Sequence, residues 1–247
     1  MTRFFIAKNE ISGTTIALAP EDAAHIRSLR LRPSEYFIVC DGEGTDHLCR
    51  LGEQGNAATA EIIESKPSES EPDVICSVYI AYSKGERLDY AVQKSVELGA
   101  YEIILYPSAR CVAIPNDIPK KTVRLQRIAL ETAKQAFRGR VPEVRHIDSF
   151  KSAIGSASTA GLPVYFYESE DRVHFKHVLD RYIPEPVPGS MFTISVVTGP
   201  EGGFEPHEAE YARQKGMHTV TLGPRILRCE TAPAAALAVI MYHTGNL

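Results

Sequence analysis

The sequence predicts an α/β protein in which a helix-covered parallel sheet follows a smaller, β-rich N-terminal region. Three observations support this prediction. After residue 73, apolar segments of strand length alternate with segments of helix length, which is typical of a parallel sheet. Before residue 70, short strand-like segments are separated by Gly42, Gly44, Gly52 and Gly55, which is typical of an all-β region. Between the two regions, Lys66–Pro72 is polar and rich in serine and proline, so we expect a linker there.

The composition is that of a soluble globular protein, with 44% apolar and 23% charged residues among 247. No apolar stretch approaches the roughly 20 residues that cross a membrane, and the N-terminus lacks the apolar core of a signal peptide. We therefore expect a cytoplasmic protein without a membrane partner. The five cysteines form no C-x-x-C pair, so we expect reduced thiols and no metal site.

The N-terminal region is expected to hold five strands and one helix. The helix, Glu21–Leu31, starts near Pro20 or Asp22. Basic residues cluster in it and directly after it, at Arg27, Arg30 and Arg32. The expected strands are Arg3–Ala7, Thr14–Leu18, Tyr36–Cys40, His47–Leu51 and Ala57–Ile63.

The C-terminal region is expected to alternate five strands with five helices. The strands are Val74–Ala81, Glu102–Tyr106, Val164–Tyr167, Phe192–Val197 and Thr219–Leu222. The helices are Arg87–Leu98, Thr122–Arg138, Phe175–Tyr182, Pro206–Lys215 and Thr231–His243, and residues 152–161 and 187–191 are expected to be loops. Gly99 and Gly216 stand where glycines commonly end helices.

The most informative stretch is MFTISVVTGPEGGF, residues 191–204. An apolar run ends abruptly in a turn with three glycines, and Glu205-Pro206 then suits the start of a helix. A strand, a glycine-rich turn and a helix in this order predict a small-ligand site in an α/β sheet. The turn matches neither G-x-x-x-x-G-K-[ST] nor G-x-G-x-x-G, and Glu201 would repel a pyrophosphate. A neutral or cationic ligand is therefore expected.

A second unusual stretch is LGPRILRCET, residues 222–231, between an expected strand and an apolar helix. Thr231 can cap that helix, which is a purely structural explanation for its presence. Arg225 and Arg228 have no such explanation, because a partly buried arginine needs a carboxylate, a carbonyl or an anionic substrate.

Basic residues are concentrated between residues 110 and 145, where nine lysines and arginines face three acids. Such a segment can bind a polyanion, but charge alone favours a solvated helix face. Glu131, Gln135 and Arg138 follow at i, i+4 and i+7 and form one polar stripe on the expected helix. That stripe is either another solvated face or the wall of a site.

At these residues the chain resembles the RsmE-type ribosomal RNA methyltransferases of the SPOUT superfamily. The two strongest matches are GPEGGF (199–204) and LGPRILRCETAPAA (222–235), with a departure at Cys229, where relatives commonly carry threonine or valine. Weaker matches are the segments Gln93–Gly99, Tyr106–Arg110, Glu131–Arg138 with the following VPE, and His25–Arg30. The resemblance spans nearly the whole chain.

The resemblance implies a PUA-like, RNA-binding β-barrel at residues 1–70 and a knotted methyltransferase domain at residues 73–247. Such a domain has a parallel sheet with a C-terminal trefoil knot, an exception to the usual unknotted topology. The resemblance further implies a homodimer, S-adenosylmethionine as cofactor, and methylation of N3 of a uridine in small-subunit (16S) ribosomal RNA.

Site residues are implied by the same resemblance. The cofactor would contact Thr198, Gly199, Glu201, Gly202, Gly203, Leu222, Gly223, Ile226, Leu227 and Arg228. RNA would contact Arg3, His25, Arg27, Arg30, Arg110 and Arg138. Arg228 first, and Arg138 second, would stabilise the negative charge that spreads over the uracil carbonyl oxygens once N3 loses its proton. Glu201, Glu230 or water would accept that proton.

Two alternatives stay open at this point. One is a related knotted methyltransferase that acts on another base, on a ribose or on transfer RNA. The other is a non-catalytic RNA-binding protein, against which the intact GPEGG stretch argues. A dehydrogenase is excluded because no G-x-G-x-x-G follows Val74–Ala81, and a hydrolase because G-x-S-x-G is missing.

Overall fold

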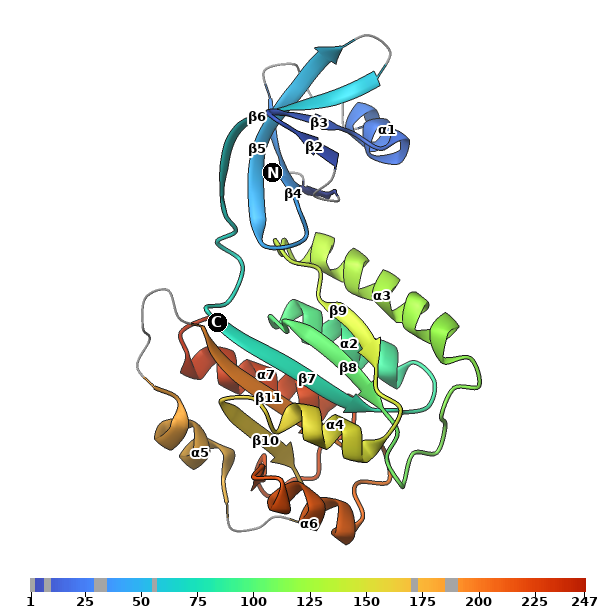
Figure 1. The fold of residues 1–247 in the computed structure, drawn as a ribbon, viewed down its shortest axis with the longest axis vertical. Coiled ribbons are helices and arrows are strands. Elements are labelled where there is room, and N and C mark those ends of the chain that lie inside the picture. The colour runs from blue at the N-terminus through green and yellow to red at the C-terminus, as the bar shows by residue number, and fades with distance from the viewer. Residues whose placement is uncertain (1–2, 7–9, 29–34, 55–56, 170–172, 185–190) are drawn as a thin grey trace. The chain divides into compact units, whose positions relative to one another are not determined.

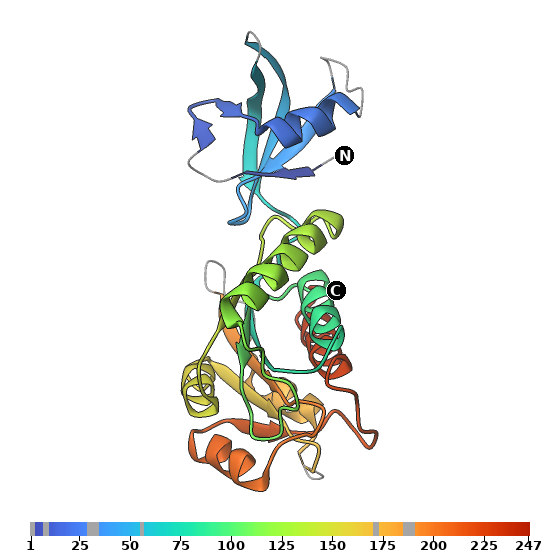
Figure 2. The same cartoon turned by 90° about the vertical axis from the view of Figure 1, so that its right-hand side faces the viewer.

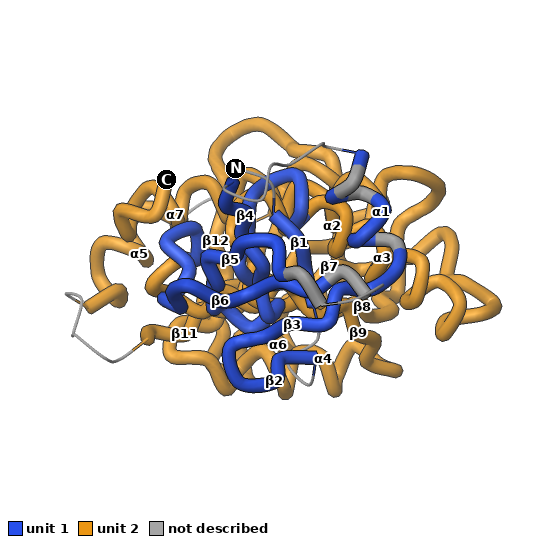
Figure 3. The backbone as a smooth tube through the Cα atoms, turned by 90° about the horizontal axis from the view of Figure 1, so that it is seen from above, with its two compact units in different colours: residues 1–71, 133–141 blue, residues 72–132, 142–247 orange. Residues whose placement is uncertain are grey.

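The computed structural model describes residues 3–6, 10–28, 35–54, 57–169, 173–184 and 191–247 (Figure 1). The chain forms two compact units, each drawn from two separate segments (Figure 3). Unit 1 comprises Met1–Glu71 and Ala133–Val141, and unit 2 comprises Pro72–Thr132 and Pro142–Leu247.

Unit 1 is built on a six-stranded mixed sheet in the order β1-β4-β5-β6-β3-β2. Its strands are β1 (Arg3–Phe5), β2 (Ile11–Ser12), β3 (Thr15–Ala17), β4 (Tyr36–Cys40), β5 (Thr45–Gln54) and β6 (Ala57–Pro67), and it contains the helix α1 (Pro20–Ser28). Only β1 and β4 run parallel; the other neighbouring strands are antiparallel. Phe4, Ile16 and Phe37 lie in the core under the sheet. In the described residues β1 and β2 remain edges, so the predicted barrel is a half-barrel.

A buried ion pair joins the two segments of unit 1. The side chain of Arg138 is only 3% exposed, and its Nε and terminal nitrogen donate to the two carboxylate oxygens of Glu71 at 3.0 and 2.6 Å. The amides of Gly139 and Arg140 donate to the same carboxylate at 2.8 and 3.0 Å. Glu71 therefore fixes the backbone of residues 138–140 as well as the arginine charge.

Unit 2 contains a six-stranded, entirely parallel sheet in the order β12-β10-β11-β7-β8-β9. Its strands are β7 (Val74–Ala81), β8 (Glu102–Tyr106), β9 (Glu143–His146), β10 (Leu162–Phe166), β11 (Phe192–Thr198) and β12 (His218–Val220). Its helices are α2 (Arg87–Glu97), α3 (Ile118–Gln135, whose last three residues belong to unit 1), α4 (Phe150–Ala157), α5 (Phe175–Tyr182), α6 (Pro206–Gln214) and α7 (Thr231–His243).

Helices cover both faces of this sheet, as the apolar strands require. Helices α2 and α7 pack together on one face, and α4 lies on the opposite face (Figure 2). On the α4 face, Ala153 and Ile154 of α4 and Ala209 of α6 join a cluster that contains Tyr79 and Tyr165 from the strands. Among the described residues, no helix has both the length and the apolar character that a membrane crossing demands.

The chain returns to the first strand of unit 2 at its end. After β12, which is an edge strand, residues 221–230 lead back to α7, which packs on β7 and β11. The trefoil knot itself stays a prediction. Beyond α7, Asn246 exchanges hydrogen bonds with the backbone amide (3.0 Å) and carboxylate (2.7 Å) of Asp73, just before β7.

The predicted α/β class and the helix-covered parallel sheet are confirmed, but several segments differ from the prediction. Residues 152–161 were expected to be a loop, yet α4 occupies Phe150–Ala157. Its serines and glycine indicate a loop locally, but Ser149 caps the first turn and the buried Ala153 and Ile154 anchor it. Strand β9 was not predicted, and β6 extends through Pro67 into the expected linker.

The Glu71–Arg138 pair predicts a large loss of stability on removal of one partner. We expect Glu71→Ala to destabilise unit 1 by about 3–5 kcal/mol, because it removes the carboxylate that accepts two hydrogen bonds from a buried guanidinium. The double variant Glu71→Ala/Arg138→Met should lose less, since no buried charge remains. Urea unfolding with hydrogen exchange resolved over unit 1 measures both effects. Glu61→Ala, which breaks an exposed pair with Arg50, is the control and should cost at most about 1 kcal/mol; equal losses for both glutamates would contradict the prediction.

Candidate functional site

A cavity of about 890 Å³ opens at the carboxyl ends of β10, β11 and β12. It is lined by all residues of three ranges, each of which starts at the last residue of a strand: 166–168 at β10, 198–203 at β11 and 220–230 at β12. Ligands of open parallel sheets bind at this edge, because the connecting loops there are free to shape a pocket. The volume is in the range of small-molecule sites.

Residues 199–203, which directly follow β11 and are called the glycine turn, form one wall of the cavity. Gly203 has φ +66°, a conformation that L side chains rarely adopt, and its amide donates to the carbonyl of Pro200 at 3.0 Å. A Cβ at Gly203 would lie 1.9 Å from a carboxylate oxygen of Glu168. That same oxygen accepts a hydrogen bond from the amide of Phe204 at 3.0 Å. The turn therefore needs glycine both for its conformation and for close approach by Glu168.

The strand end that carries the turn is tied to its neighbours by buried hydroxyl groups. The phenol of Tyr106 donates to the carbonyl of Thr198 at 2.9 Å. The hydroxyl of Thr198 donates to the carbonyl of Tyr79 at 3.3 Å. These bonds connect the last residue of β11 to residues of β8 and β7, so the start of the turn is fixed by the sheet.

Glu201 projects from the turn toward the start of α2. Its Oε1 accepts from the backbone amide of Lys84 at 2.7 Å and from the guanidinium of Arg87 at 3.2 Å. Its Oε2 is buried, and no hydrogen-bond partner for it exists among the described residues. A buried carboxylate oxygen without a donor is costly, so this atom suits a ligand that brings an N–H or O–H group.

A second carboxylate lies near Glu201 at the end of the loop. The Cys229 thiol donates to Glu230 at 3.2 Å, and the guanidinium of Arg228 lies 3.9 Å from the same carboxylate. Burial, helped by the hydrogen bond to Glu230, raises the pKa of Cys229 to about 12, so its thiol stays protonated. Burial alone would raise the pKa of Glu230, but its hydrogen bonds and the charges of Arg87 and Arg228 lower it.

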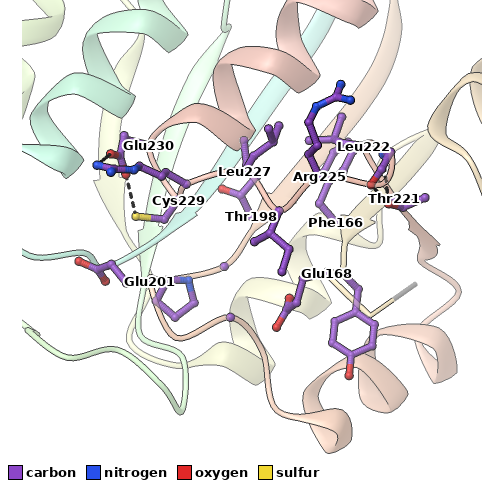
Figure 4. Close-up of a pocket in the computed structure, with 18 of the residues that line it drawn as sticks. Phe166, Glu168, Thr198, Glu201, Thr221, Leu222, Arg225, Leu227, Cys229 and Glu230 are labelled. Atoms are coloured by element: carbon purple, nitrogen blue, oxygen red, sulfur yellow. Dashed lines mark hydrogen bonds and ion pairs between the residues drawn. The ribbon is translucent and has the colours of Figure 1, made fainter. Parts of the chain in front are cut away.

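Charges of both signs line the cavity, because Arg87 contacts Glu201 and Arg228 lies near Glu230. Glu201, Cys229 and Glu230 gather at one end, and Arg225 and Leu222 lie toward the other (Figure 4). Arg228 is 80% exposed at the rim, so its guanidinium is free to meet a second, larger ligand. The arrangement suits a cationic small molecule inside and an anionic or polar substrate at the opening.

All ten residues predicted to bind the cofactor line this one cavity, and so does Glu230. Arg138 is not among the described residues that line it, because it is engaged with Glu71 in unit 1. Its predicted role in the reaction stays a prediction. Sequence analysis missed Arg87, Phe166, Glu168 and Cys229 in the lining. The signal for Glu168 was its place directly after an expected strand of the parallel sheet.

The residues predicted to contact RNA are placed differently. Arg3 is 11% exposed, pairs with Asp46 at 2.7 Å and also donates to the carbonyl of Phe137, so it has a structural role in unit 1. Arg110 contacts the glycine turn. The side chains of His25 and Arg27, and the whole of Arg30, lie outside the described residues. The described residues contain no group of three or more histidine, cysteine, aspartate or glutamate side chains that could hold a metal ion.

Comparison with known proteins gives a consistent result. The family described as RNA methyltransferase domain matches residues 70–241. Ribosomal RNA small subunit methyltransferase E of Bacillus subtilis is 31% identical over 255 residues, which cover 100% of this chain and 98% of that protein. The protein of the same name from Mesomycoplasma hyopneumoniae is 29% identical and covers 94% of this chain and 95% of its own.

A solved structure agrees with these relatives. The crystal structure of ribosomal RNA small subunit methyltransferase E from Neisseria gonorrhoeae, bound to S-adenosyl methionine, superimposes with a TM-score of 0.80 at 30% identity. The match covers 98% of this chain and 97% of that one. With the family match over residues 70–241 and full-length relatives at about this identity, the chain belongs to the RNA methyltransferase domain family.

Proposed function

We propose that this chain transfers a methyl group from S-adenosylmethionine to N3 of a uridine in small-subunit ribosomal RNA. The single observation that carries the proposal is the convergence of both predicted cofactor stretches, GPEGGF and LGPRILRCET, on one cavity. The relatives of similar length and architecture are small-subunit ribosomal RNA methyltransferases, and one is bound to S-adenosyl methionine.

The residues present fit this cofactor. S-adenosylmethionine is a cationic molecule with an ammonium group, and the buried Oε2 of Glu201 offers it an acceptor. The glycine turn lines the cavity without side chains at Gly199, Gly202 and Gly203. When bound, the cofactor supplies a methyl group on a sulfonium, which is already reactive. The chain's own task is therefore to bind it, orient it and activate the acceptor.

Activation of uracil requires removal of the N3 proton, after which negative charge spreads onto the two flanking carbonyl oxygens. The guanidinium of Arg228 supports such a role, because it belongs to the cavity lining, is exposed and can donate hydrogen bonds to such oxygens. Glu230, whose pKa is lowered, is ionised at neutral pH and can accept the proton, as can Glu201 or water. Because N3 lies on the pairing edge, the uracil must be unpaired or flipped out of its stack.

For the RNA, we propose that residues 1–70 act as a docking module. The support is the cluster of His25, Arg27 and Arg30 in the sequence, since the positions of these side chains are not described. Phosphate contacts of this kind supply affinity and register rather than base recognition. Arg138 remains the second choice after Arg228 for a role at the uracil.

We also propose a homodimer formed through α7. From Thr231 to Tyr242 this helix carries no charged side chain, and such a helix is normally buried all round. One side packs on the sheet through Ala236, Leu237 and Ile240, but Val239 is 40% and Tyr242 78% exposed. A second copy would cover this face, since identical apolar patches pair readily around a two-fold axis.

The cofactor proposal predicts that Gly203→Val abolishes binding of S-adenosylmethionine in calorimetry. A β-branched residue cannot hold φ +66° without strain, and its Cβ would displace Glu168. Gly216→Val is the matched control, because Gly216 also has a positive φ (+82°) but an added Cβ there would meet nothing within 4 Å. Equal loss of affinity in both variants would show that general strain, not the cavity, is responsible.

The catalytic proposal predicts that Arg228→Ala lowers kcat by about 10²–10³ at saturating cofactor. Raising the pH should bring the kcat of the variant closer to that of the native protein, because a larger fraction of the uracil then loses its N3 proton without help from Arg228. Arg228→Lys, which keeps the charge, should retain more activity than Arg228→Ala. A normal kcat with only a raised KM for S-adenosylmethionine would instead assign Arg228 to cofactor binding.

The dimer proposal predicts that Val239→Glu converts the protein to monomers in light scattering at micromolar concentration. A carboxylate at the centre of an apolar interface loses hydration without a partner, which should raise the dimer dissociation constant at least about 100-fold. Val123→Glu is the control, since Val123 is an exposed valine on α3. A monomeric native protein, or dissociation by both variants, would contradict the proposed interface.

A further inference from the structure

The outer side of the glycine turn is held by Arg110, a residue of the loop after β8. Its Nε donates to a carboxylate oxygen of Glu205 at 2.8 Å, and a terminal nitrogen donates to the carbonyl of Gly202 at 3.0 Å. These two bonds span the turn and the residue that precedes α6. The guanidinium fork is suited to this task, because its donors are rigidly spaced.

The backbone also approaches Arg110 closely. A Cβ at Gly202 would lie 3.0 Å from the Cβ of Arg110 and 3.2 Å from its carbonyl oxygen. Such distances are tighter than ordinary van der Waals contact. The close approach of Arg110 on the outer side of the turn therefore requires glycine at position 202. In the same way, the close approach of Glu168 on the inner side requires glycine at position 203.

The hydrogen bonds of Arg110 fix one particular peptide group. The carbonyl of Gly202 is held by Arg110, and the amide of Gly203 in the same peptide group is held by the carbonyl of Pro200. The next amide, that of Phe204, is held by Glu168. Both ends of the Gly202–Gly203 peptide group are thus fixed before any ligand arrives, which lowers the entropy lost on binding.

Arg110 is itself held in place by a buried carboxylate. Glu208 of α6 is 3% exposed and accepts from the hydroxyl of Ser108 at 3.0 Å and from the amide of Ala109 at 3.0 Å. It also accepts from the amide of Glu205 at 3.0 Å. Residues 108–110 and the start of α6 therefore form one rigid support for the turn.

From these contacts we propose that Arg110 is a positioning residue for the cofactor turn, and that it acts there rather than as a contact to RNA. The inference deepens the proposed function and rests on it. Loss of Arg110 frees the Gly202–Gly203 peptide group, so that S-adenosylmethionine must order the turn when it binds. A charge-assisted hydrogen bond at a half-exposed site then accounts for about a 5- to 10-fold change in affinity.

The direction of the change in cofactor affinity shows whether Arg110 acts by positioning the turn or only through its charge. Removing a positive charge near the cavity would, by charge alone, strengthen the binding of a cationic cofactor. A weaker affinity in an Arg110 variant therefore reports the lost position of the turn. The pKa of Glu205 is lowered by its hydrogen bond to Arg110, so the pair stays ionised near neutral pH.

The test compares Arg110→Met, which keeps the length of the side chain, with Arg110→Lys, which keeps the charge but not the fork. Calorimetry should show the dissociation constant of S-adenosylmethionine raised about 5- to 10-fold for Arg110→Met and less for Arg110→Lys. KM for the cofactor should rise in parallel, with kcat near the native value at saturation. Arg124→Met is the matched control, since Arg124 pairs with Asp89 on the surface of unit 2 away from the cavity lining, and it should change neither constant.

Other outcomes would overturn the inference. Cofactor affinity within twofold of native, with RNA affinity and its salt dependence reduced, would assign Arg110 to phosphate binding. A lower melting temperature with unchanged cofactor affinity would assign it a structural role only. Should Arg110→Met fail to fold, Glu205→Gln weakens the same support with the arginine still present and is expected to weaken cofactor binding in the same direction. Failure of the native protein to bind S-adenosylmethionine would remove the proposed function itself, which is a distinct result.

Discussion

A single buried carboxylate organises the region where the sheet meets its ligand cavity. Glu208 is withdrawn from solvent, so its charge must be compensated by hydrogen bonds inside the fold. Its donors come from Ser108 and Ala109 after β8 and from Glu205 at the start of α6. Glu208 therefore fixes the loop after β8 against the start of α6. The glycine turn, which lies between β11 and α6, is held in its conformation as a result.

The cavity meets two opposite electrostatic requirements at once. A cationic cofactor requires negative charge, and Glu201 of the turn and Glu230 of the last loop supply it at one end of the cavity (Figure 4). An RNA substrate requires positive charge, and Arg225 and Arg228 lie on the same last loop. Placing both signs on one ten-residue loop lets the same backbone segment serve both ligands. Hydrogen bonds from the backbone and from Cys229, with the charges of Arg87 and Arg228, lower the pKa of Glu230 and keep its carboxylate ionised.

Much of this arrangement could be predicted from the sequence, because it depends on local backbone chemistry. Glycines in a turn after an apolar strand indicate a site wherever the chain later folds, and GPEGG and LGPRILRCET do lie together. Side-chain partners between distant segments could not be predicted. The basic character of Arg110 suggested RNA, whereas its partners Gly202 and Glu205 lie more than ninety residues away. Helix α4 was missed for a similar reason, since burial by other elements outweighs its weak local propensity.

Segments that lie far apart in the sequence contact each other in both units, and this affects folding while the chain is being synthesised. The strand β7 is made early, but the helix that packs on it, α7, is made last, and Asn246 then bonds to Asp73. Unit 1 is likewise incomplete until residues 133–141 have been synthesised, because Glu71 pairs with Arg138 in that segment. Contacts so distant in sequence are slow to form and leave apolar strands uncovered meanwhile. The nascent protein thus passes most of its synthesis without a cavity, and its ability to bind a ligand appears only once translation is nearly complete.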